Sequence, residues 1–163
     1  MFYEAEWDMT NSLAEIEKKG LEEAEYAIKT RPKDVQRAWK TILLIEKTAE
    51  EEGLLALEDK LETILQIKAP YYKLLESLLI LLVDGTDANL IYEVMTNDYY
   101  TREHDAGTNF IFFLYQLCVK DILESIRYGC PDPKPLSEIL EHYMIYIPSQ
   151  YYQEFYEILQ TYL

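Results

Sequence analysis

The chain has 163 residues, of which 30 are acidic and 15 are basic, and its formal net charge is −15. The acidic residues are spread along the whole sequence, so the molecule should repel phosphate backbones and anionic lipids. We therefore expect no nucleic-acid partner and no direct membrane insertion. A basic surface of another protein is the better match, although acidity also serves solubility alone.

The sequence starts with Met1 and has no basic segment followed by an apolar one, so nothing indicates export and we expect a cytoplasmic protein.

Helical periodicity begins near the N-terminus. Ser12 and Glu15 have the spacing of a capping box, which predicts that the first helix begins there. This helix should end just before Pro32, because proline cannot continue it.

A long amphipathic helix is predicted from about residue 33 to residue 66. Its apolar residues recur every three or four positions and form one stripe, made of Ile42, Ile45, Ala49, Ala56, Leu57, Leu61 and Ile64. Gly53 lies inside this pattern, where a glycine costs roughly 0.5–1 kcal/mol relative to alanine. Three explanations are open: the glycine allows another backbone to approach closely, it permits a bend, or it lies at a helix junction beside a solvated face.

The same segment carries acidic residues on both sides of Gly53. Glu50, Glu51 and Glu52 point in different directions around a helix, so they would form a broad acidic collar instead of one row of like charges. We predict that Glu50, Glu51 and Glu58 bind a basic surface of a partner protein. The alternative is that these residues form a solvated face without a partner.

Two further helices are predicted between residues 70 and 107. Proline is favoured in the first turn of a helix, so Pro70 should begin the first of them, and Gly85 should end it in a left-handed conformation. Thr86 or Asp87 should then cap the second helix, whose apolar residues are Ile91, Val94 and Met95.

Three short motifs follow one another in this part of the chain. Glu-Gly-Leu-Leu-Ala-Leu-Glu spans residues 52–58, Val-Asp-Gly-Thr-Asp spans residues 83–87, and Arg-Glu-His at residues 102–104 closes the next helix. With these motifs, the segment of residues 39–107 resembles the cytoplasmic segment of the flagellar motor stator A-subunit, MotA, of the MotA/TolQ/ExbB proton-channel family. The resemblance implies a helical domain that binds rotor switch or stator proteins in a regulatory or assembly role.

The chain departs from this family in two respects. The membrane helices that form the family's ion path have no counterpart in the sequence, so the resemblance implies no ion channel formed by this chain alone. In the family, a basic residue three positions before the glycine and an acid five positions after it face charged groups on the rotor. The acidic position corresponds to Glu58 in this sequence. The basic position corresponds to Glu50, beside Glu51, so the charge there is reversed and the resemblance does not imply torque generation.

The C-terminal part, residues 108–163, is predicted to consist of three helices. The run from Phe110 to Tyr128 predicts the most hydrophobic one, but its uncharged apolar stretch is shorter than the about 20 residues that a spanning helix needs. Two short helices rich in tyrosine follow, separated by Pro148, after a rigid loop that contains Pro131, Pro133 and Pro135. Tyrosine suits core margins and protein interfaces, and compositional bias is the alternative explanation.

No pattern of catalytic or metal-ligating residues emerges, and no phosphate loop, nucleophile elbow or zincin-type helix occurs. Cys118 and Cys130 lack the spacing of a disulfide or metal site and should be ordinary thiols. His104 and His142 should be exposed, because a metal site needs three or four ligands and nothing in the sequence brings these two together. Asp84 begins an apparent calcium loop whose twelfth position is not the required glutamate. We expect no enzyme, no cofactor and no metal site.

The sequence as a whole predicts an all-α fold, a single-domain bundle of about seven helices over residues 1–163 with one long central helix. Its predicted function is that of a soluble, non-catalytic protein that acts by protein–protein interaction at the flagellar motor. The alternative is a general helical structural or scaffold protein with no role in motility. The oligomeric state is left open.

Overall fold

The computed structural model describes residues 2–127, 129 and 134–163, with side chains described from residue 10 onward. This part of the chain is helical and contains no β-strand, which confirms the all-α prediction. It contains nine α-helices, a number close to the prediction of about seven. The α-helices are α1 (Phe2–Thr30), α2 (Pro32–Glu52), α3 (Ala56–Asp59), α4 (Leu61–Leu65), α5 (Tyr72–Val83), α6 (Ala88–Thr101), α7 (Thr108–Ile122), α8 (Leu136–His142) and α9 (Tyr152–Gln160). Three short helical turns complete them, the π-helical η1 (Leu123–Arg127) and the 3-10 turns η2 (Tyr143–Tyr146) and η3 (Ser149–Tyr151).

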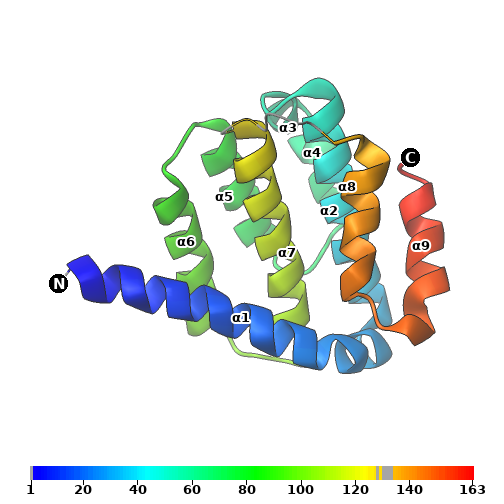
Figure 1. Cartoon of the computed structure of the whole chain (residues 1–163), viewed down its shortest axis with the longest axis horizontal. Coiled ribbons are helices and arrows are strands. Elements are labelled where there is room, and N and C mark those ends of the chain that lie inside the picture. Colours follow the sequence, from blue (N-terminus) through cyan, green and yellow to red (C-terminus); the bar gives the residue numbers. More distant parts are fainter. Residues whose placement is uncertain (1, 128, 130–133) are drawn as a thin grey trace.

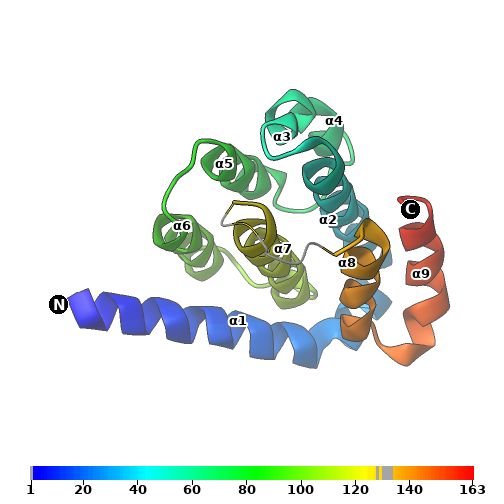
Figure 2. The same ribbon diagram turned by 45° about the horizontal axis from the view of Figure 1, so that its top comes forward.

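Helix α7 lies in the middle of the bundle. Figures 1 and 2 show α5 and α6 on one side of it, α2, α8 and α9 on the other, and α1 running across α6 and α7 toward α2. Every side chain from Phe110 to Tyr115 is 0% exposed, because neighbouring helices surround this part of α7. The buried apolar side chains of the described residues, except Ile139, form one continuous cluster around it. None of the described helices combines the length and the apolar character that crossing a bilayer requires.

Helix α1 is longer than predicted. It begins at Phe2 and Ser12 lies inside it, so the predicted start at Ser12 is wrong. The predicted boundary between the first two helices is correct, since α1 ends at Thr30 and α2 begins at Pro32.

Helices α1 and α7 approach each other closely at Gly20. A methyl group built on Gly20 would lie 2.5 Å from Phe113 Cβ and 2.9 Å from the carbonyl oxygen of Asn109. The same two helices are joined by a hydrogen bond in which Asn109 Nδ2 donates to Glu23 Oε2 at 2.6 Å. The glycine therefore lets two helical backbones meet where a side chain would hold them apart.

The predicted continuous helix over residues 33–66 is wrong. Helix α2 ends at Glu52 after 21 residues, and the short helices α3 and α4 follow it. Gly53 has φ 94° and ψ 168°, a conformation that is essentially restricted to glycine, and its N–H donates to the carbonyl oxygen of Ala49 at 3.0 Å. A Cβ at Gly53 would meet no atom within 4 Å, so close approach is not the reason for the glycine. Of the three explanations, the helix junction is correct.

Helix α5 begins at Tyr72, after Tyr71 in a left-handed conformation with φ 58°, so the predicted start at Pro70 is wrong, whereas the glycine and aspartate signals mark helix boundaries as predicted. Gly85 after α5 and Gly107 before α7 have φ 77° and φ 88°, and Asp87 Oδ1 accepts a hydrogen bond from the backbone N–H of Asn89 at 2.9 Å. Helix α7 ends earlier than predicted, at Ile122, and the π-helical η1 continues from it. The predictions that concern Tyr128, Cys130, Pro131 and Pro133 lie outside the described residues.

The C-terminal helices are attached to α2 through Trp39. The Trp39 side chain is 0% exposed, and its Nε1–H donates to the carbonyl oxygen of Phe155 at 3.2 Å. Its ring meets the rings of Tyr143 and Phe155 edge-on, with centroid distances of 6.2 and 5.4 Å. The tyrosine-rich C-terminal part thus covers one face of α2.

Candidate functional site

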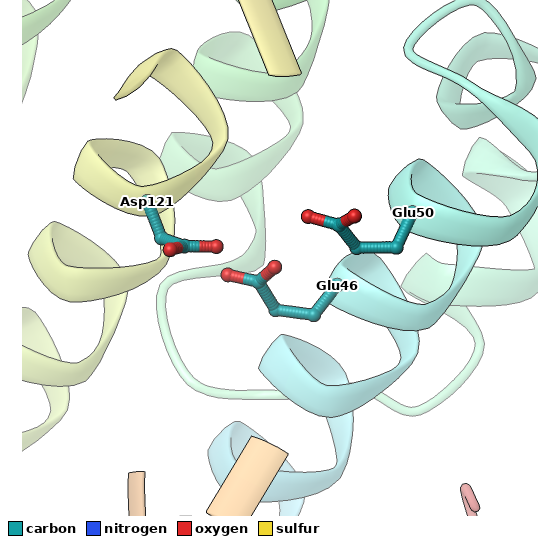
Figure 3. A group of neighbouring side chains, drawn as sticks. All are labelled: Glu46, Glu50 and Asp121. Carbon is teal, nitrogen blue, oxygen red and sulfur yellow. The ribbon is translucent and has the colours of Figure 1, made fainter. Parts of the chain in front are cut away.

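The structure separates the three predicted partner-binding residues. Glu51 and Glu58 are exposed, as a docking role requires, but Glu50 is only partly exposed. Figure 3 shows the Glu50 side chain pointing from α2 toward Asp121 of α7. Glu50 therefore belongs to a cluster between two helices, so it does not share an exposed acidic collar with Glu51 and Glu52 as predicted, and it lies apart from Glu58.

The cluster consists of the carboxyl groups of Glu46, Glu50 and Asp121. Glu46 and Glu50 lie on successive turns of α2 and so project from one face of it, whereas Asp121 lies in the last turn of α7. One oxygen from each carboxyl group lies within 4.8 Å of one oxygen of each of the others. In Figure 3 the Glu46 carboxyl group points into the space between Glu50 and Asp121.

The hydrogen bonds of the cluster leave part of it unsatisfied. Tyr143 Oη donates to Glu46 Oε1 at 2.7 Å, and Ser125 Oγ donates to Asp121 Oδ1 at 3.2 Å. Each carboxyl group retains one buried oxygen without a hydrogen-bond donor, namely Glu46 Oε2, Glu50 Oε1 and Asp121 Oδ2. None of the ion pairs formed between described residues involves the cluster. Buried carboxylates without a compensating charge are costly.

This environment favours the protonated forms of the buried groups. Burial raises the pKa of Glu46 well above 4.5, and the charge of Asp121 raises it further. Burial and then the charge of Asp121 also raise the pKa of Glu50. Burial and the Glu46 carboxyl group together raise the pKa of the Tyr143 hydroxyl and of the Cys118 thiol.

We expect the Glu46 carboxyl group to make the protein less stable as the pH rises. Its pKa is higher in the folded chain than the usual 4.5, so its favourable contribution is fully present below about pH 4.5 and is lost as the pH rises through the folded pKa. Glu46→Gln keeps the shape of the side chain but cannot ionise. In chelator-treated samples, the stability of this variant relative to wild type should therefore increase with pH, by at most about 1.4 kcal/mol for each pH unit.

Denaturant unfolding at a series of pH values measures this difference. The matched control is Glu51→Gln, which removes an exposed carboxyl group in the same helix. Its stability relative to wild type should stay nearly constant over the range. A difference between Glu46→Gln and wild type that does not change with pH would contradict the expectation.

An exposed acidic surface lies where α2 ends and α3 and α4 follow, at the top of Figure 1. We define the acidic end as its exposed acidic residues, Glu51, Glu52, Glu58, Asp59 and Glu62, together with the groove that Glu58 lines. The groove has a volume of about 20 Å³ and is lined by Leu57, Glu58, Leu61, Leu79, Ile80, Val83 and Asp84. Beside these residues the apolar side chains of Leu55 and Ile80 are 70% and 42% exposed. The acidic end thus combines negative charge with accessible apolar surface.

The other residues that the sequence analysis named lie in structural contacts or in exposed positions. Arg102 forms an ion pair with Asp98 at 3.0 Å and lies over the ring of Tyr71 at 4.5 Å from its centroid. His104 and His142 are exposed, as predicted, and neither belongs to a group of potential metal ligands among the described residues. Cys118 is a buried free thiol.

Two members of the carboxylate cluster, Glu46 and Asp121, were missed by the sequence interpretation. A signal exists for each of them. Glu46 falls on the apolar stripe of α2, beside Ile45, and Asp121 follows the apolar run of α7. A carboxylate on an otherwise apolar helix face indicates a buried polar contact.

Comparison with known proteins identified no related protein. No protein-family model matches the chain, and neither the curated proteins nor the solved structures contain a significant match.

Proposed function

We propose that this protein is non-catalytic and acts by binding a partner protein through the acidic end. The observation that carries the proposal is the exposed Leu55 side chain, 70% accessible, in a surface where Glu51 and Glu58 are also exposed. A partner with basic residues around an apolar anchor would complement both properties. Interfaces of this kind combine an apolar centre with a charged rim.

The size of the groove favours a protein partner over a small molecule. Sites for small molecules are clefts of about 300–1,000 Å³. The groove at the acidic end, with about 20 Å³, has room for the tip of one apolar side chain. Lys60, the basic residue within this surface, already forms an ion pair with Glu52 at 2.5 Å. The surface therefore remains negative and open to a basic partner.

The resemblance to the MotA cytoplasmic segment supports the flagellar motor as the place of action. Glu58, the acid that carries over from the family's rotor-facing pair, is exposed and lines the groove. Glu50, at the position of the family's basic residue, instead faces Asp121. The proposed role is therefore binding of a rotor switch or stator protein in regulation or assembly, and the competing hypothesis is a general structural protein.

Charge reversal at the acidic end tests the proposal. Glu51→Lys combined with Glu58→Lys should slow association with a rotor switch or stator cytoplasmic fragment about tenfold or more at low salt, because complementary charge mainly raises the association rate. Binding of the wild type should also weaken steeply as salt is added, since the Debye length is about 8 Å at physiological ionic strength. Surface plasmon resonance over a salt series measures both effects.

The matched control reverses two exposed acids elsewhere, Glu22→Lys in α1 with Glu141→Lys in α8. It changes the net charge by the same amount and should retain most of the association rate. If both double variants lost the same share of the association rate, the effect would come from overall charge. The hypothesis of a general structural protein would then replace the hypothesis of binding through the acidic end. Absence of wild-type binding to either fragment would contradict the assignment to the motor.

A further inference from the structure

We propose that Glu46, Glu50 and Asp121 bind one hard divalent cation between α2 and α7. The carboxyl groups converge within 4.8 Å, and each contributes one buried oxygen that has no hydrogen-bond donor. Glu46 carries the argument furthest. Its side chain is 0% exposed, and its free Oε2 belongs to the carboxyl group that points into the space between the other two. This inference is independent of the proposed function of the acidic end.

A shared proton explains the arrangement less completely than a cation does. A single proton between two carboxyl groups satisfies one oxygen of each and leaves the third carboxyl group with a buried oxygen without a partner, so protons alone would have to number at least two. A divalent cation can bind all three oxygens at once. It also supplies two positive charges to a group of three acidic side chains.

The ligand atoms define the class of metal ion. Carboxylate oxygens favour hard cations such as Ca²⁺, Mg²⁺ and Mn²⁺ over softer ones. The nearby Cys118 is not one of the converging ligands, and its Sγ is directed to the carbonyl oxygen of Ile42 at 4.0 Å. Ca²⁺ binds oxygen at about 2.3–2.6 Å, so three ligands spread evenly around it are about 4.0–4.5 Å apart. Oxygens that all lie within 4.8 Å of one another are therefore close enough to converge on one cation of this class.

A cavity that Asp121 borders offers room for water at one side of the cluster. It has a volume of about 270 Å³ and lies between α7, α8 and η2, with Asp121 and Tyr143 in its wall. A water molecule occupies about 30 Å³ in the liquid, so several fit there. Water can complete the coordination sphere, since Ca²⁺ takes six to eight oxygen ligands. Tyr143 holds Glu46 Oε1 by its hydrogen bond and leaves Oε2 free for the cation.

Titration of the intact, chelator-stripped protein tests the proposal. Isothermal titration calorimetry with CaCl₂ should give one site per chain, and the melting temperature should rise with the logarithm of the Ca²⁺ concentration. Glu46→Gln should abolish both the heat and the rise, and Glu50→Gln should weaken both. Glu51→Gln, which removes a neighbouring exposed carboxyl group, should leave both unchanged.

A second measurement locates the ion and does not depend on the stability of the variants. Mn²⁺ is paramagnetic, so substoichiometric MnCl₂ should broaden the amide signals of residues around Glu46 and Asp121 in the wild type before any others. Broadening centred on residues 51–62 would place the ion at the acidic end and overturn the proposal. A protein that binds none of Ca²⁺, Mn²⁺ and Mg²⁺ at millimolar concentration would also overturn it, and the cluster would then hold protons alone.

Discussion

Replacing Gly20 with alanine is expected to destabilise the protein by about 1–3 kcal/mol, the usual range for overpacking a core. The added Cβ would lie 2.5 Å from Phe113 Cβ and 2.9 Å from the Asn109 carbonyl oxygen. Neither of these atoms can rotate away, because both are fixed to the α7 backbone, so α1 and α7 must move apart. Helix propensity acts in the opposite direction, since alanine is favoured over glycine by roughly 0.5–1 kcal/mol.

Thermal unfolding followed by circular dichroism measures this loss, at about 2–4 °C for each kcal/mol in a chain of this size. Lys18→Ala in the same helix serves as the control, because Lys18 is exposed and should change stability by no more than about 0.5 kcal/mol. A melting temperature of Gly20→Ala that equals or exceeds that of the wild type would show that α1 does not pack on α7 at this point.

Truncation of Trp39 should have a larger effect. Trp39→Ala is expected to cost about 3–5 kcal/mol, because it leaves a cavity where a fully buried indole ring packs. The change also removes the edge-on contacts with Tyr143 and Phe155 and the hydrogen bond to the Phe155 carbonyl oxygen. Equilibrium unfolding in urea gives the total loss, and hydrogen exchange at the α9 amides reports whether the C-terminal helix has detached.

Trp39→Phe separates the two contributions. Phenylalanine keeps an aromatic ring among these side chains but lacks the Nε1–H donor, so its loss should be clearly smaller than that of alanine. Protection of the α9 amides should then stay close to that of the wild type. Equal losses in the two variants would mean that the hydrogen bond, not the ring packing, holds the C-terminal helices on α2.

Helix boundaries that depend on one residue's own chemistry could be predicted from the sequence. Pro32, Gly85 and Asp87 mark boundaries because the fixed φ of proline, the positive φ of glycine and the acceptor of aspartate are properties of the residue itself. Gly20 and Gly53 show the limit of this reasoning. Both lie in helical patterns, yet Gly20 permits a close contact between helices whereas Gly53 ends a helix, and the difference lies in tertiary structure.

The candidate site was predictable only in part, for a similar reason. The exposure of Glu51 and Glu58 follows from their place in a charged segment. The position of the Glu50 side chain between two helices could not be predicted, because it depends on Asp121. Asp121 lies far along the chain and comes close to Glu50 only because α7 packs on α2. Helical periodicity gives the direction of each side chain around its own helix, but it contains no information on which helices become neighbours.

The packing of α1 on α7 determines the order in which the newly synthesised chain can fold. The buried face of α1, with Ile16, Ala24 and Ala27, belongs to a helix that packs chiefly on α7, which begins at Thr108. Ribosomes add about 5–20 residues each second, so this face emerges several seconds before its partner exists. Docking of α1 must therefore follow the synthesis of the five helices between them. The apolar face of α1 is consequently a surface of the nascent chain that stays open to aggregation or to a chaperone until α7 has been synthesised.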